Sequence, residues 1–219
     1  MESDFHSKGK DIEVSESGAG AHAVIMEASP FGLQSKKLAI WLFIASDAVT
    51  FGVLLFGYSY LRLGSLDWSY PFKGASILNG FIMTVILLTS SLTMLAAVIA
   101  AKHDDKRRCL RWIGFTILLG TIFAVLHLRE WFHMFGEGWA IYKNPLGGSP
   151  VFAAGFFGIT GLHLLHVISG VIALSILAIR YNNGVLDKNH VETTSLYWHF
   201  VDLVWMFVFP IMYLMNAAR

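Results

Sequence analysis

The residue of this sequence with the clearest potential for chemistry is Asp47, which lies within the apolar run at residues 41–64. A charged side chain at the centre of a bilayer costs about 2.5–3.5 kcal/mol on insertion scales, so such a residue normally has a polar partner or a function. A buried carboxylate can take up and release protons, or it can pair with a polar group on a neighbouring helix. Both roles are open for Asp47 on the sequence alone.

Further ionisable residues lie in or beside later apolar runs and are candidates for bundle contacts, lipid contacts or proton handling. They are His127, Glu130, His163, His166, His199 and Asp202. A haem between two helices needs one histidine on each, whereas His163 and His166 lie three residues apart on one predicted helix. Polar side chains in membrane bundles also hydrogen-bond neighbouring helices. We favour such structural contacts, expect no metal site, and keep a membrane b-type cytochrome or a transporter as alternatives of a different class.

The composition is that of a membrane protein. Of the 219 residues, 55% are hydrophobic and 14% are charged, whereas soluble domains are about 25% charged. The single cysteine, Cys109, excludes an internal disulfide framework. A net charge of +1 with no basic stripe gives no indication of a nucleic-acid partner. The sequence also lacks the HExxH, CxxC and phosphate-loop motifs of common soluble enzymes.

Five long apolar segments must position these side chains. They cover approximately residues 37–63, 75–101, 110–135, 150–180 and 192–217. Each exceeds the roughly 20 residues that a helix needs to cross about 30 Å of hydrocarbon, and continuous apolar runs can satisfy their backbone there only as helices. The pattern predicts an all-α integral membrane protein, with a five-helix bundle over residues 36–219. Residues 1–35 are predicted to form a polar, largely disordered tail, and they carry no signal-peptide pattern.

The distribution of basic residues predicts the orientation in the membrane. With five spans, 11 of the 16 lysines and arginines fall on the side of the N-terminus and 5 on the other side. The segment between the second and third spans, KHDDKRRCLR, contributes most to this difference. Because cytoplasmic loops are enriched in Lys and Arg, we expect the N-terminus in the cytoplasm and the C-terminus in the periplasm.

Helical periodicity predicts a partner for Asp47. At 100° per residue, Asp47 shares one face of its helix with Thr50 and Tyr58. It lies about 15 Å from the cytoplasmic end of its span, and the histidines of the fourth span lie at a similar depth. We therefore predict a neutralising contact of Asp47 with either His163 or His166.

Several of these segments together resemble subunit III of the haem–copper oxidases. The strongest pieces are TGLHLLHVISG at 160–170 and YWHFVDLVWMFVF at 197–209, and the resemblance covers about residues 37–217. It implies a subunit without a catalytic centre or cofactor of its own, within a proton-pumping terminal oxidase that reduces oxygen to water. In the family, the position of Asp47 normally carries a glutamate. Many members have seven helices, so this chain resembles the shorter bacterial form that lacks the first pair.

The resemblance also implies partners and a location. The main contact would be subunit I, which holds haem and copper, and subunit II is a further candidate for copper. Phospholipid bound to the chain, other oxidase subunits and a respiratory supercomplex are further expected partners. The implied role is to stabilise the haem–copper subunit, its lipids and its proton uptake, in a bacterial cytoplasmic (inner) membrane. A quinol oxidase subunit III and an accessory protein of nitric oxide reductase are alternatives within the same sequence type.

Overall fold

The structure is a computed structural model that describes residues 35–66, 68–72, 74–147 and 150–217. The tail predicted for residues 1–35 therefore lies outside the described residues, except for Ser35, where the first helix begins. The described residues belong to one compact unit. It contains the helices α1 (Ser35–Gly64), α2 (Gly74–Lys102), α3 (Lys106–Gly136), α4 (Val151–Asn182) and α5 (Lys188–Met212), followed by a short 3-10 turn at Leu214–Asn216.

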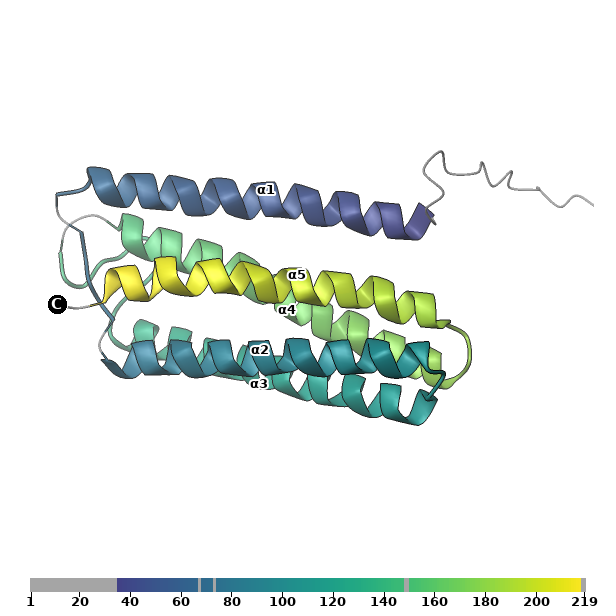
Figure 1. The fold of residues 1–219 in the computed structure, drawn as a ribbon. Helices are drawn as coiled ribbons and strands as arrows, with labels where there is room; N and C mark the ends of the chain where they lie inside the picture. Colours follow the sequence, from purple (N-terminus) through teal and green to yellow (C-terminus); the bar gives the residue numbers. More distant parts are fainter. Residues whose placement is uncertain (1–34, 67, 73, 148–149, 218–219) are drawn as a thin grey trace, which may run out of the picture. The chain divides into compact units, whose positions relative to one another are not determined.

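These five helices confirm the predicted all-helical architecture. Their apolar spans are 28 to 32 residues long, which is enough to cross a membrane by length and composition. The helices α2, α3, α4 and α5 pack around a common core, and α1 lies at the edge against α4 and α5 (Figure 1). We call the end of the bundle where α1, α3 and α5 begin the basic end. The end where these three helices finish is called the opposite end.

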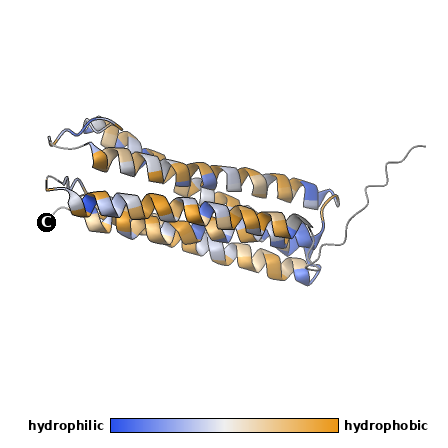
Figure 2. Cartoon of the chain, turned by 90° about the horizontal axis from the view of Figure 1, so that it is seen from above, coloured by the Kyte–Doolittle hydropathy of each residue, from blue (hydrophilic) through white to orange (hydrophobic). Residues whose placement is uncertain are grey.

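The outside of the bundle is apolar and part of its interior is polar, which is the reverse of a soluble protein. Hydrophobic residues cover most of each helix, and hydrophilic residues gather near the helix ends (Figure 2). The fully buried residues nevertheless include several polar side chains, namely Ser90, Thr116, His127, Thr160, His163 and Asn216. Lipid cannot hydrogen-bond these groups, so the fold must turn them toward neighbouring helices.

Glycines allow close approach of helices at two junctions. A Cβ atom at Gly120 on α3 would lie 2.5 Å from a ring carbon of Trp198 on α5, which is closer than real Cβ atoms come. A Cβ atom at Gly155 on α4 would overlap the ring of Tyr58 on α1. Small residues at these positions therefore set how deeply the two aromatic rings insert between the helices.

Candidate functional site

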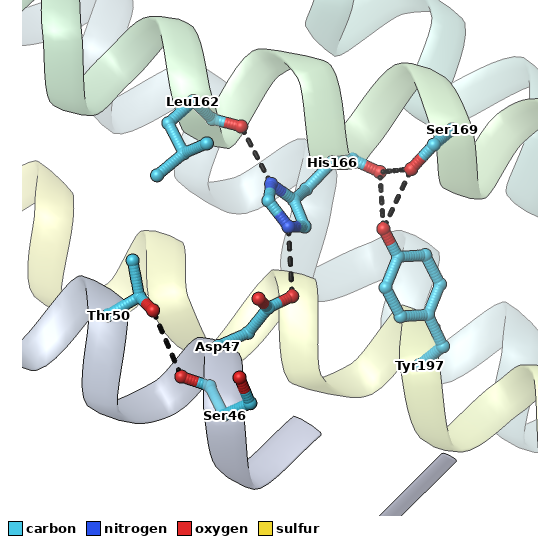
Figure 3. A network of polar contacts seen from close by, with 7 residues as sticks. All are labelled: Ser46, Asp47, Thr50, Leu162, His166, Ser169 and Tyr197. Carbon is cyan, nitrogen blue, oxygen red and sulfur yellow. Dashed lines mark hydrogen bonds and ion pairs between the residues drawn. The ribbon is translucent and has the colours of Figure 1, made fainter. Parts of the chain in front are cut away.

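The side chain of Asp47 contacts His166 across the interface of α1 and α4. Asp47 Oδ2 lies 2.9 Å from His166 Nε2, and the two side chains are 18% and 16% exposed. His166 Nδ1 lies 2.8 Å from the carbonyl oxygen of Leu162 (Figure 3). Of the two partners predicted for Asp47, the structure thus selects His166.

This geometry requires a proton in the Asp47–His166 contact. A carbonyl oxygen only accepts hydrogen bonds, so Nδ1 of His166 carries a hydrogen and donates it to Leu162. Nε2 then bonds Asp47 in one of two ways, with the proton on the carboxyl group or on the ring. The pair has no net charge in either arrangement, which lowers the cost of placing it at bilayer depth. The contact can therefore hold one proton.

A second group of contacts fixes the backbone around His166. Ser169 donates to the carbonyl oxygen of His166 at 2.9 Å, and its hydroxyl lies 2.7 Å from the hydroxyl of Tyr197 on α5. Tyr197 also donates to the His166 carbonyl at 3.2 Å (Figure 3). Sequence reasoning missed both residues, although Ser169 lies one helical turn after His166 and could have been found by that spacing.

The other two residues of the predicted Asp47 face behave differently from Asp47. Thr50 is exposed and donates to the carbonyl oxygen of Ser46 on its own helix at 3.1 Å (Figure 3). Tyr58 is buried, and its hydroxyl accepts a hydrogen bond of 2.8 Å from Asn216 at the opposite end. A shared helix face therefore does not bring these side chains to one site.

His163 and His127 lie deeper, in a box of aromatic rings. The His163 ring stacks on Trp205 at 5.1 Å between centroids, and the His127 ring lies 5.6 Å from Trp205. Phe123 lies within 5.8 Å of both imidazoles. No ring nitrogen of the two histidines has a hydrogen-bond partner among the described residues. One helical turn along α3 from His127, Glu130 accepts a hydrogen bond of 2.7 Å from Asn79 on α2.

His199 and Asp202 belong to a separate seam between α2 and α5. His199 Nδ1 lies 2.7 Å from the hydroxyl of Ser91. The Asp202 carboxyl is buried, and neither of its oxygens has a hydrogen-bond partner among the described residues. In the same seam, Trp198 donates to Ser90 at 3.1 Å and Trp205 donates to Thr84 at 3.0 Å. Three side chains of α5, those of Trp198, His199 and Trp205, thus join it to hydroxyl groups of α2.

The indole hydrogen bond of Trp205 provides a first test of this seam. We expect Trp205→Phe to lower the free energy of unfolding by about 1–2 kcal/mol, because it removes a buried hydrogen bond to Thr84 and leaves a small void. The measurement is an SDS titration of the purified chain in detergent, followed by circular dichroism. Trp112→Phe is the control, since Trp112 is 38% exposed on α3. Equal losses in both variants would contradict a special role of the seam.

Polar contacts at the two ends of α1 were not predicted either. At the basic end, Lys37 Nζ lies 3.0 Å from Glu192 Oε1 on α5. At the opposite end, Arg62 donates to the carbonyl oxygen of Met215, and Trp68, which follows α1, donates to Asn216 at 2.7 Å. The residues of each contact are far apart in sequence, and no spacing rule connects them. Together with Asp47 these contacts attach α1 at three depths.

The described residues contain no group of three or more His, Cys, Asp or Glu side chains that could hold a metal ion. The candidate residues from the sequence are instead spread over the α1–α4 contact, the aromatic box, the Asn79–Glu130 contact of α2 and α3, and the α2–α5 seam.

Comparison with known proteins identifies the family. The family model described as cytochrome c oxidase subunit III matches residues 6–217. This chain belongs to the cytochrome c oxidase subunit III family. The cytochrome c oxidase subunit 3 of Bacillus subtilis (strain 168) is 35% identical over 191 residues, which are 84% of this chain and 88% of that protein. The chain is thus a multi-pass membrane subunit of a haem–copper terminal oxidase, in complex with other oxidase subunits.

Relatives of a second oxidase class match about equally well. The cytochrome bo(3) ubiquinol oxidase subunit 3 of Pseudomonas aeruginosa is 31% identical over 183 residues, covering 81% of this chain and 83% of that protein. A probable quinol oxidase subunit 3 of Staphylococcus aureus (strain USA300) is 31% identical over 191 residues, covering 83% and 90%. Subunit III relatives therefore serve oxidases with different electron donors.

Proposed function

We propose that this chain is the non-catalytic subunit III of a proton-pumping cytochrome c oxidase that reduces oxygen to water. The observation that carries the proposal is that the hydrogen-bonded ionisable side chains in the membrane spans bond neighbouring helices. The Asp47–His166 contact is one example. Such contacts stabilise a bundle and support a role in maintaining the complex. Haem and copper would belong to subunit I, with subunit II as a further candidate for copper.

A quinol oxidase is the second candidate, favoured by the names of the relatives from Pseudomonas aeruginosa and Staphylococcus aureus. Turnover of the purified complex with reduced cytochrome c, and separately with a quinol, distinguishes the two. The proposed stabilising role of this subunit is the same in both.

The proposed orientation places the basic end in the cytoplasm and the opposite end in the periplasm. The 11-to-5 distribution of lysine and arginine supports it. Within the described residues, Lys106 and Lys188 lie at the basic end, where they bond the Asn182 carbonyl and Asp104. The membrane would be the bacterial cytoplasmic (inner) membrane, which fits the bacterial sources of the relatives.

The proposed partners of α1 are subunit I and phospholipid. Most of the outer face of α1 is apolar and exposed, including Val53 at 65%, Phe56 at 74% and Leu63 at 82%. In a membrane this face must meet lipid chains or another subunit. Partner helices or lipid would also take the place of the helix pair found in longer family members. Other oxidase subunits and a respiratory supercomplex complete the proposed assembly.

The proposed support of proton uptake rests on Asp47. Its contact with His166 holds one proton and lies between α1 and α4, with both side chains mostly buried. Such a group can release and regain a proton: release leaves the pair with a net charge of −1, and uptake restores its neutrality. It would act beside the large subunit, whose own groups carry the oxygen chemistry.

Removal of the subunit tests the stabilising role. Oxidase stripped of this chain should start at a similar rate and then lose activity during turnover several-fold faster than the intact complex, because its large subunit and lipids are no longer held. The measurement is oxygen consumption over successive turnovers in detergent with added phospholipid. Adding the purified chain back should restore the lifetime. Equal lifetimes of stripped and intact enzyme would contradict the proposal.

A further inference from the structure

The interior of the bundle holds a set of polar atoms without protein partners. The inner polar cluster is defined here as His127, Glu130, His163 and Tyr213, whose side chains are 0–7% exposed. Six of their polar atoms have no hydrogen-bond partner among the described residues, namely both ring nitrogens of each histidine, Oε1 of Glu130 and the Tyr213 hydroxyl. Native structures rarely leave so many buried polar atoms unpaired.

Three members of the inner polar cluster lie around one ring, and the fourth, Glu130, lies one helical turn from one of them. The indole of Trp205 is 5.1 Å from the His163 ring, 5.6 Å from the His127 ring and 6.1 Å from the Tyr213 ring, between centroids. Glu130 follows His127 by one turn of α3 and therefore lies on the same face of that helix. These side chains therefore lie in one region between α3, α4 and the end of α5.

Water is the ligand whose chemistry fits this region. Each neutral imidazole offers one donor and one acceptor, the tyrosine hydroxyl offers both, and Glu130 Oε1 has acceptor capacity. An unpaired buried polar group costs about 1–3 kcal/mol, and an internal water typically makes about three hydrogen bonds to such groups. An anion would meet the Glu130 carboxyl, and the described residues contain no metal-binding group. Water both donates and accepts, as this mixture requires.

We propose that the inner polar cluster binds internal water molecules, and that these extend the Asp47–His166 contact to Asn79 on α2. His163 precedes His166 by one turn of α4, so one end of the cluster lies beside the pair. At the other end, Asn79 donates to Glu130 at 2.7 Å. The hydrated path takes members from α1, α2, α3 and α4, together with Tyr213, which directly follows α5.

Such waters would give Asp47 a hydrogen-bonded connection through the bundle. The proton in the Asp47–His166 contact would then be linked to polar groups on α3 and α2, and not only to the α1–α4 interface. The proposal does not depend on the electron donor of the oxidase or on the lifetime of the stripped enzyme, so those tests and the one below fail independently.

Hydroxyl-radical footprinting of the intact oxidase in detergent tests for these waters. A brief X-ray exposure generates radicals from water, and bound internal water modifies the side chains beside it. We expect modification of Tyr213 and His163 several-fold above that of Met94 and Phe152, which are equally buried, at 0% and 1% exposed, but lie outside the cluster. Mass spectrometry measures each site. Equal modification of the cluster and the two controls, whether low or high, would overturn the proposal.

A matched pair of variants tests whether the modification depends on bound water or only on the presence of the aromatic rings. Tyr213→Phe keeps the aromatic ring and removes one water ligand, so modification of His163 should fall toward the level of Met94. His163→Gln keeps a donor and an acceptor at α4, so modification of Tyr213 should persist. Unchanged His163 modification in Tyr213→Phe would overturn the assignment of the hydroxyl to the water site. If a variant does not assemble into the oxidase, the modification of His163 and Tyr213 relative to Met94 in the unaltered protein decides the proposal.

Discussion

Gly120→Leu should lower the free energy of unfolding of the subunit by about 3 kcal/mol, near the upper end of the usual cost of overpacking. The reason is the contact between α3 and α5, where a Cβ at position 120 would lie 2.5 Å from Trp198 and 3.0 Å from Val171 of α4. Trp198 is fully buried and bonded to Ser90, so its ring has little room to move. An SDS titration in detergent, followed by circular dichroism, measures the loss.

Gly114→Leu is the control for this prediction. Gly114 lies on the same helix, and a Cβ there would meet nothing within 4 Å. Replacing a helical glycine with leucine favours the helix by several tenths of a kcal/mol or more. The control should therefore be neutral or slightly stabilising. If the two leucine variants lost stability equally, the close approach at Gly120 would not be the cause.

The five helices were predictable because the bilayer leaves few alternatives. A long apolar run has no water to bond its backbone, so residues such as those around Asp47 and His163 had to become helical. The contact of Asp47 with the fourth span was predictable for a related reason, since an acidic group at that depth needs a partner. The helical periodicity and the depth of Asp47 in its span were enough to predict that its partner is one of two histidines.

The choice between the two histidines was not predictable. His163 and His166 differ by one turn, about 4.5 Å in depth and about 60° around the helix. The rotation of α4 against α1 depends on packing, here on the insertion of Tyr58 over Gly155. That packing turns His166 to Asp47 and His163 into the aromatic box. Such interlocking of side chains is a property of the assembled bundle and not of one helix.

Local competition for hydrogen bonds explains why Thr50 does not contact another helix through its hydroxyl. Thr50 shares a face with Asp47, yet its hydroxyl bonds the Ser46 carbonyl of the preceding turn. Threonine hydroxyls in helices commonly make this bond, so a polar face does not by itself predict a contact with another helix. The contact of Asn216 with Trp68 and Tyr58 was beyond reach for a different reason, because it depends on the path of the chain after α5.

The Asp47–His166 contact should give strongly non-additive effects of substitution. We expect Asp47→Leu and His166→Leu each to destabilise the subunit, because each leaves a polar group near the bilayer centre without its partner. The double variant should lose less than the sum of the two. Coupling energies of interhelical hydrogen bonds in membranes reach about 1.7 kcal/mol, and we expect a value of about 1–1.7 kcal/mol here. The same SDS titration measures all variants.

Two controls distinguish the shared proton from packing. Thr50→Val combined with His166→Leu should be additive, because Thr50 bonds its own helix and not His166. Asp47→Asn should retain most of the stability, since the amide can donate to Nε2 of His166 while Nδ1 donates to Leu162. The asparagine keeps the hydrogen bond but cannot release its proton. Additive losses in the Asp47 and His166 leucine cycle would contradict a direct interaction. A loss in Asp47→Asn as large as in Asp47→Leu would instead show that the pair is held as carboxylate and imidazolium.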